Sequence, residues 1–209
     1  MNKALKYCVL VLVIGLMAYK SVYFKKLSEV TKTQDEKFDA TTYARKLWDE
    51  RLPQRIDTAV ELTSLIKSIE VNPQDAFVRF SNAMGIGNYR FSLVKITGTV
   101  AAINEDDVII RINHADSLMS VRLATEYVYG NAVRDASGLL DLKDFTNTSD
   151  LNSISEELNK TIRSKVLPAF RQQVKVSDKI EAIGAIQFNK SHIDFNNLEI
   201  IPARIKILK

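Results

Sequence analysis

Residues 91–123 read FSLVKITGTVAAINEDDVIIRINHADSLMSVRL, and this stretch decides the fold. Apolar residues alternate with other residues in three runs, 91–103, 108–113 and 119–123, and polar turns separate the runs. Alternation with a period of two is typical of β-strands that bury one face. Gly98 lies inside the long first run, where a bulge or a sharp bend is expected. The stretch therefore predicts three consecutive strands with a bend in the first.

A long helix is predicted after these strands. Residues 150–167 carry apolar side chains at helical spacing, and Pro168 marks the predicted end of the helix. Ser153 and Glu156 stand three residues apart near its start, which is the spacing of a capping box. This helix separates the first three strands from the rest of the chain.

Two more alternating runs, 180–188 and 201–207, follow the helix and predict two further strands. Three strands, a helix and two strands is the order of the OB fold, in which a bent first strand serves both sides of a closed sheet. We therefore predict an α+β protein with an OB-fold-like, five-stranded barrel. A generic α+β domain with a five-stranded meander is the alternative.

The residues before the barrel are predicted to be helical. One helix covers 41–51 and ends at Pro53, and a second covers 57–70. A third helix begins after Asn72, which has the side chain of an N-cap, with Pro73 at its first position. Three helices thus precede the strands.

The organisation of the chain follows from these elements. Residues 1–24 form an apolar leader, 25–37 a polar tether, 38–88 a helical subdomain and 89–209 the barrel with its helix. We see no internal repeat and no low-complexity tract. About 170 residues remain after the tether, which is enough for one ordinary core.

The leader begins with Lys3 and Lys6, and an apolar run follows from Tyr7 to Tyr19. A basic start before an apolar core is typical of an export signal. Either the signal is cleaved, or residues 7–24 stay in the inner membrane as a single-pass anchor with Lys20 reaching the headgroups. We favour the anchor because no good small-residue cleavage site follows the core. A signal of this kind places the C-terminal domain in the bacterial periplasm.

Lipidation is not expected from the position of the cysteine. A lipoprotein signal places a cysteine after the apolar core, whereas Cys8, the single cysteine of the chain, lies at the beginning of the core. We interpret Cys8 as a small apolar residue.

The charge argues against a nucleic-acid partner. The chain has 29 basic and 25 acidic residues, and three of the lysines but none of the acids lie in residues 1–24. The remainder holds 26 basic and 25 acidic residues, and no dense basic run follows Lys26. Because phosphate neutralisation supplies most of the affinity for nucleic acid, such proteins carry a basic surplus on one face. We therefore exclude nucleic acid, although OB folds often bind it.

The best candidate for a functional site is the segment 129–147, YGNAVRDASGLLDLKDFTN. It joins the third strand to the long helix and mixes polar residues and glycines with several apolar residues. An arginine here can bind a carboxylate or phosphate with two hydrogen bonds, and the acids can bind sugar hydroxyls. The alternative is an internal salt bridge between Arg134 and one aspartate that pins the loop. The candidate ligand-binding residues are Asn131, Arg134, Asp135, Asp144 and Asn147.

Three stretches resemble a family of predicted periplasmic lipoproteins, the domain of unknown function 2291. They are FDATTYARKLWDERLPQ at 38–54, NAVRDASGLLDLKDFTN at 131–147 and KVLPAF at 165–170, and the resemblance extends over about 38–208. It implies an OB-like barrel with added helices. Genes of this family often stand beside those of sugar ABC transporters, which implies a role in sugar uptake. This chain differs from the family in lacking the lipidation cysteine.

Three functions remain open. The first is a non-enzymatic accessory protein that binds the permease or the sugar-binding protein of a sugar ABC transporter. The second is an independent binding module for a sugar or an anion. The third, which we disfavour, is a hydrolase that uses Asp135 and Asp144 as paired carboxylates. We predict no cofactor and no metal, since His114 and His192 lie in separate turns and a zinc site needs three or four convergent ligands.

Overall fold

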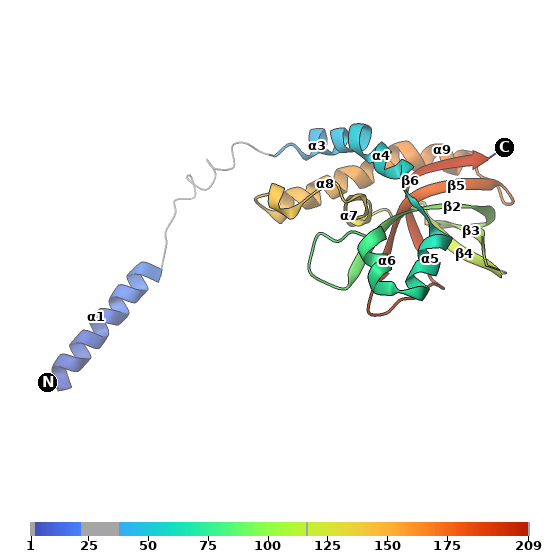
Figure 1. Cartoon of the computed structure of the whole chain (residues 1–209). Coiled ribbons are helices and arrows are strands. Elements are labelled where there is room, and N and C mark those ends of the chain that lie inside the picture. Colours follow the sequence, from blue (N-terminus) through green and yellow to red (C-terminus); the bar gives the residue numbers. More distant parts are fainter. Residues whose placement is uncertain (1–2, 22–37, 116, 209) are drawn as a thin grey trace. The chain divides into compact units, whose positions relative to one another are not determined.

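The computed structural model describes residues 3–21, 38–115 and 117–208 of the chain (Figure 1). The chain divides into two compact units, Met1–Phe38 and Asp39–Lys209. The second unit contains all of the described strands and the helices that pack on them.

The described part of the first unit includes one long helix, α1 (Lys3–Ser21). Within the described residues, we find no helix with the length and apolar character that a membrane crossing requires. The predicted single-pass anchor is therefore not supported. Residues 22–24 of that prediction, and the predicted tether at 25–37, lie outside the described residues.

Five strands of the second unit close into a ring. Their order around the ring is β2-β3-β4-β6-β5, and β5 pairs back to β2. All neighbours are antiparallel except β4 and β6, which are parallel. Each of the five matches a predicted strand, extended by one to a few residues. The strands are β2 (Tyr89–Ile103), β3 (Asp107–His114), β4 (Ser117–Ala124), β5 (Lys179–Asn189) and β6 (Glu199–Leu208).

Gly98 is the point where β2 passes from one neighbour to the other. From Tyr89 to Thr99 the strand pairs with β5, and from Thr99 onward it pairs with β3. A Cβ atom at Gly98 would lie 2.4 Å from the backbone oxygen of Arg111 in β3. Only glycine permits this close approach of two backbones, so the predicted bend has a direct steric cause.

The first helical segment continues past the proline that was expected to end it. It consists of α3 (Ala40–Lys46), a π-helical turn η1 (Leu47–Arg51) and α4 (Leu52–Asp57). Pro53 lies in the first turn of α4, where a backbone N–H has no intrahelical partner. The predicted end at this residue is therefore wrong, because the wider turn before it admits the proline ring.

A short strand interrupts the second predicted helix. β1 (Val60–Glu61) pairs in parallel with β2, and α5 (Leu62–Val71) begins only after it. The prediction that Val60 lies in a helix is wrong, because the strand pairing outweighs the helical spacing. The third prediction is confirmed: α6 (Pro73–Phe80) begins after Asn72, whose Oδ1 accepts from the Asp75 N–H at 3.2 Å.

The long helix between β4 and β5 repeats the pattern of the first segment. It consists of α8 (Thr148–Thr161), a π-helical turn η3 (Ile162–Val166) and α9 (Leu167–Gln173). Pro168 again lies in the first turn after the π-helical turn, so the predicted end at this residue is also wrong. In two of the three stretches that resemble the family, a proline thus lies in the first turn after a π-helical turn.

Two hydrophobic clusters hold the second unit together. One joins the interior of the ring to α5 and α6, and the other joins the outer faces of β2, β5 and β6 to α4, η3 and the helix that follows β4. Helices therefore lie on different sides of the ring (Figure 1). Fully buried members of the two clusters include Leu65, Ile66, Val94, Ile110, Leu123, Ala185, Ile162 and Leu52.

Candidate functional site

The segment predicted as a functional loop contains a short helix. α7 (Ala132–Ser137) is followed by Gly138 in the left-handed region, with φ 61°, and then by the 3₁₀ turn η2 (Leu142–Asp144). A six-residue helix is too short to show a clear apolar period in the sequence. Residues 133–137 are nevertheless buried, and α7 packs on β2 and β5.

Arg134 and Asp135 form a buried ion pair. Arg134 Nε donates to Asp135 Oδ1 at 2.7 Å, and Arg134 Nη1 donates to the backbone oxygen of Leu151 in α8 at 3.1 Å. Asn131 Nδ2 donates to Asp135 Oδ2. The structure thus contains the internal salt bridge that the sequence offered as the alternative, and this pair joins α7 to α8.

The environment of Asp135 disfavours the ionised form of its carboxyl group. Burial raises the pKa of the Asp135 carboxyl above its ordinary value, although the hydrogen bonds from Arg134 and Asn131 act in the opposite direction. Both carboxylate oxygens already accept a hydrogen bond. This side chain is therefore a structural partner of the guanidinium within the described chain.

Two arginines from the first helical segment hold the end of α7. Arg55 Nε donates to the Ser137 oxygen and Arg51 Nη2 donates to the Leu139 oxygen, both at 2.8 Å. Asn82 Nδ2 donates to a further carbonyl oxygen of α7 at 3.0 Å. These bonds satisfy carbonyl groups that a helix end leaves without partners. The Arg51 bond also connects the first stretch that resembles the family to the second.

A pocket of about 510 Å³ lies between the start of α7 and one face of α8. Asn159 Nδ2 closes one wall by donating to the Gly130 oxygen at 2.8 Å. At the rim, the Arg163 guanidinium carbon lies 5.2 Å from the centre of the exposed Tyr129 ring, a cation–π distance. The lining residues are Tyr129, Gly130, Asn131, Arg134, Asn152, Ser155, Glu156, Asn159 and Arg163.

The pocket contains two of the five predicted residues, Asn131 and Arg134, with Asp135 directly behind them. The sequence analysis missed the five lining residues that α8 and η3 contribute. These residues repeat at helical spacing along the side of α8 next to the apolar stripe, so a polar stripe was the signal that could have found them. They are Asn152, Ser155, Glu156, Asn159 and Arg163.

The other two predicted residues lie elsewhere. Asn147 is the N-cap of α8, and its Oδ1 accepts from the Asp150 N–H at 2.9 Å. The capping box predicted at Ser153 is wrong, since the Ser153 hydroxyl donates to the Ser149 oxygen inside the helix. Asp144 is exposed at the end of η2. It lines neither the pocket between α7 and α8 nor the separate, smaller hollow that Asp135 lines.

The capping role of Asn147 can be separated from ligand binding. Replacing Asn147 with alanine is expected to lower the free energy of unfolding by about 1 kcal/mol, because one N–H of the first turn of α8 loses its acceptor. Urea unfolding measures this change. Asn147→Ser keeps an acceptor without placing a second carboxylate beside Asp150 Oδ2, and it should recover most of the stability; an equal loss in both variants would contradict the capping role.

Among the described residues, no group of three or more histidine, cysteine, aspartate or glutamate side chains converges in a way that could hold a metal ion. The pocket instead presents guanidinium groups, side-chain amides, a hydroxyl and one carboxylate. These groups bind by hydrogen bonds and charge.

The fold has a match among solved structures. A crystal structure of an OB-fold protein from Thermotoga maritima superposes with a TM-score of 0.72, covers 83% of this chain and 100% of its own, and is 23% identical in sequence. At this identity the likeness shows the fold alone. The predicted α+β, OB-fold-like ring of five strands with added helices is thereby confirmed.

The sequence also has a match among protein families. A comparison with curated proteins found no match. The sequence model of the predicted periplasmic lipoproteins, the domain of unknown function 2291, matches residues 12–206. This range includes the strands of the ring except the last two residues of β6, together with α7 and the pocket between α7 and α8. The chain therefore belongs to the family of predicted periplasmic lipoproteins defined by that domain, as a periplasmic, membrane-associated protein.

Proposed function

We propose that this protein is a non-enzymatic periplasmic binding protein, and that the pocket between α7 and α8 takes a small polar ligand. The observation that carries the proposal is the convergence of Arg134 and Arg163 with a row of neutral hydrogen-bonding side chains from α8. Guanidinium groups bind a carboxylate or phosphate, and side-chain amides bind hydroxyls. The ligand class is therefore a sugar that carries an anionic group, such as a sugar acid.

The hydrogen-bonding capacity of Arg134 supports this ligand class. Its bonds to Asp135 and Leu151 use Nε and Nη1, and Nη2 has no partner within the described chain. An arginine offers five N–H donors in a fixed plane. One edge of the guanidinium is thus held by the protein while another remains for a ligand.

A binding role fits the pocket better than catalysis. Glu156 is the one carboxylate that lines the pocket, and it is exposed on α8. Asp135 is buried behind Arg134 and Asn131, which donate to its two oxygens, and it does not line the pocket, so it is poorly placed to take a proton from a substrate. The exposed Asp144 lies outside the pocket. These placements argue against the paired-carboxylate hydrolase.

We also propose that the protein serves uptake, with the permease or the sugar-binding protein of a sugar ABC transporter as its partner. A membrane-associated periplasmic protein that binds a sugar acid would act next to such a transporter. Chemical cross-linking in native membranes, followed by purification in mild detergent, tests this association. Recovery of the cross-linked protein without any transporter component would overturn it.

Ligand binding has a direct test on the full-length protein in mild detergent. Galacturonate or glucuronate is expected to raise the melting temperature, and Asn152→Ala is expected to weaken binding by about tenfold, because it removes a hydrogen bond to the ligand. Isothermal titration calorimetry measures the affinity. The Asn152 side chain is exposed, so the fold should persist.

Asn113→Ala is the matched control, since this exposed residue lies in β3, away from the pocket. Its affinity should equal that of the wild type. Neutral sugars that bind as tightly as sugar acids would contradict the role of the two guanidinium groups. If none of these sugars or inorganic phosphate binds, the proposed ligand class is wrong.

A further inference from the structure

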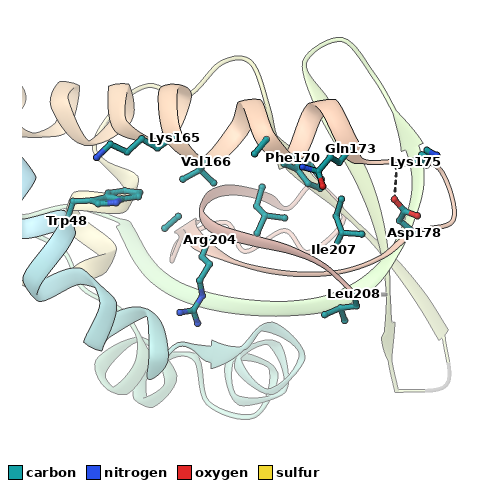
Figure 2. Close-up of a pocket in the computed structure, with 13 residues that line it drawn as sticks. Trp48, Lys165, Val166, Phe170, Gln173, Lys175, Asp178, Arg204, Ile207 and Leu208 are labelled. Carbon is teal, nitrogen blue, oxygen red and sulfur yellow. Dashed lines mark hydrogen bonds between the residues drawn. The ribbon is translucent and has the colours of Figure 1, made fainter.

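A second hollow, larger than the pocket between α7 and α8, lies between β6 and the helices η3 and α9. We call this hollow the β6 groove; its volume is about 710 Å³. Figure 2 shows Trp48 at one end of the groove and Leu208 near the other. The groove is lined by Trp48, Lys165, Val166, Ala169, Phe170, Gln173, Lys175, Asp178, Ala203, Arg204, Ile205, Ile207 and Leu208.

One edge of β6 has no strand partner along most of its length. β6 pairs with β5 from Ile200 to Leu208, but it pairs with β4 only at Glu199 and Ile200. From Ile201 onward, the edge that faces away from β5 has no strand beside it within the described residues. No other hydrogen bond of the described chain reaches the backbone of residues 201–208. Residues 201–203 are buried, so the alternate N–H and C=O groups that are available to a new strand lie within residues 204–208.

The helices beside this edge leave room along it. η3 and α9 run next to β6, and their side chains Val166 and Phe170 form the opposite wall of the groove (Figure 2). Ile205 and Ile207 are half-buried on the strand, and Leu208 is 41% exposed. An extended segment laid along the edge could therefore form backbone hydrogen bonds and bury alternate apolar side chains, as in strand addition.

The charges around the groove are mostly positive. Lys165 and Lys175 line it and outnumber the one acid in the lining, Asp178, whose carboxylate accepts from the Lys175 backbone N–H at 2.8 Å. Arg204 also lines the groove, with its Nη1 paired to Asp57 Oδ1 at 2.9 Å, and the exposed Lys206 lies on the same strand. A partner with acidic side chains would complement this surface.

The same charges disfavour a second copy of this chain. Two β6 edges side by side would bring Arg204 and Lys206 of one copy against the same residues of the other. Basic side chains on an edge strand are a common protection against such self-pairing. The groove therefore favours a different protein over a homodimer.

We infer that the β6 groove binds an extended segment of another protein, in which apolar and acidic residues alternate, as an added strand next to β6. The apolar residues would face Phe170, Ile205 and Ile207, and the acidic residues would face the lysines at the rim. This inference does not depend on the ligand of the pocket between α7 and α8, because the two hollows share no lining residue.

The test uses the full-length protein in mild detergent and a fluorescein-labelled heptapeptide that alternates valine with glutamate. We expect saturable binding in fluorescence anisotropy and slower amide hydrogen exchange in residues 204–208. The same peptide with alternate backbone nitrogens methylated should lose binding, because a methylated nitrogen cannot donate to the β6 edge. A peptide that alternates valine with lysine should not bind.

Lys165→Glu combined with Lys175→Glu is the diagnostic variant, because both lysines line the groove. Both side chains are exposed, so the fold should persist, and the glutamate peptide should bind about tenfold more weakly while the lysine peptide gains affinity. Lys67→Glu, an exposed lysine of α5, is the matched control and should leave both affinities unchanged. Failure of the glutamate peptide to bind, equal binding of both peptides, or cross-linked dimers through β6 would each overturn the inference.

Discussion

Replacing Gly184 with alanine is expected to lower the free energy of unfolding by about 3 kcal/mol. The added Cβ would lie 2.2 Å from the backbone oxygen of Ile201 and 2.8 Å from the Cα of Pro202. Both atoms belong to the backbone of β6, so neither can rotate away, and the strand itself must shift. The register between β5 and β6 is irregular at this point, which concentrates the strain there. Urea unfolding measures the change.

The matched control is Gly87→Ala. A Cβ at Gly87 has no atom within 4 Å, so this substitution should stay within about 0.5 kcal/mol of the wild type. If Gly184→Ala were as stable as Gly87→Ala, the close approach of β5 and β6 would not be a constraint on the ring.

Replacing Arg134 with methionine is expected to cost about 3–5 kcal/mol at neutral pH, the range for breaking a buried ion pair. The variant leaves the Asp135 carboxylate 4% exposed and without the Nε bond of 2.7 Å. It also removes the bond from α7 to the Leu151 oxygen. Urea unfolding at several pH values measures the loss.

The loss should shrink in acid, and the sign follows from the pKa of Asp135. Burial already raises this pKa, and removing Arg134 takes away a group that opposes the effect. A carboxyl whose pKa is higher in the folded state favours folding below its unfolded pKa and loses that contribution as the pH rises through the folded value. The gap between wild type and variant should therefore widen from about pH 4 upward.

Two further variants separate charge from packing. Lys160→Met breaks an ion pair of 3.4 Å to Glu157 in which the lysine side chain is 66% exposed, and it should cost less than about 1 kcal/mol. Arg134→Met combined with Asp135→Asn removes both charges and should recover part of the loss. A loss from Arg134→Met that is the same at every pH would show that packing, and not the buried charge, holds α7 to α8.

The ring could be predicted from the sequence because each strand carries its own period-two signal. Gly98 also indicated the bend, because a glycine inside a strand usually marks a place where the strand bends or another backbone comes close. The prolines misled the prediction because a π-helical turn precedes each of them, and a single π-helical turn has no clear sequence period. The helical start at Val60 failed because a neighbouring strand, far away in sequence, decided its conformation.

The site could be predicted only in part. Arg134 and Asp135 are adjacent, so their pairing was a local proposal that the sequence could offer. The remaining pocket residues come from another helix, and the β6 groove is built from Trp48, η3, α9 and the last strand, which no local pattern connects. Only the folded chain brings these elements together.

Neighbouring strands of the ring are paired over very different lengths. β2 and β5 are joined by eleven residue pairs, whereas β4 and β6 are joined by two. The β4–β6 junction is consequently the seam at which the structure would part first, because it offers the fewest backbone bonds to break. A breathing motion at this seam would free still more of the β6 backbone without disturbing the longer ladder on the opposite side.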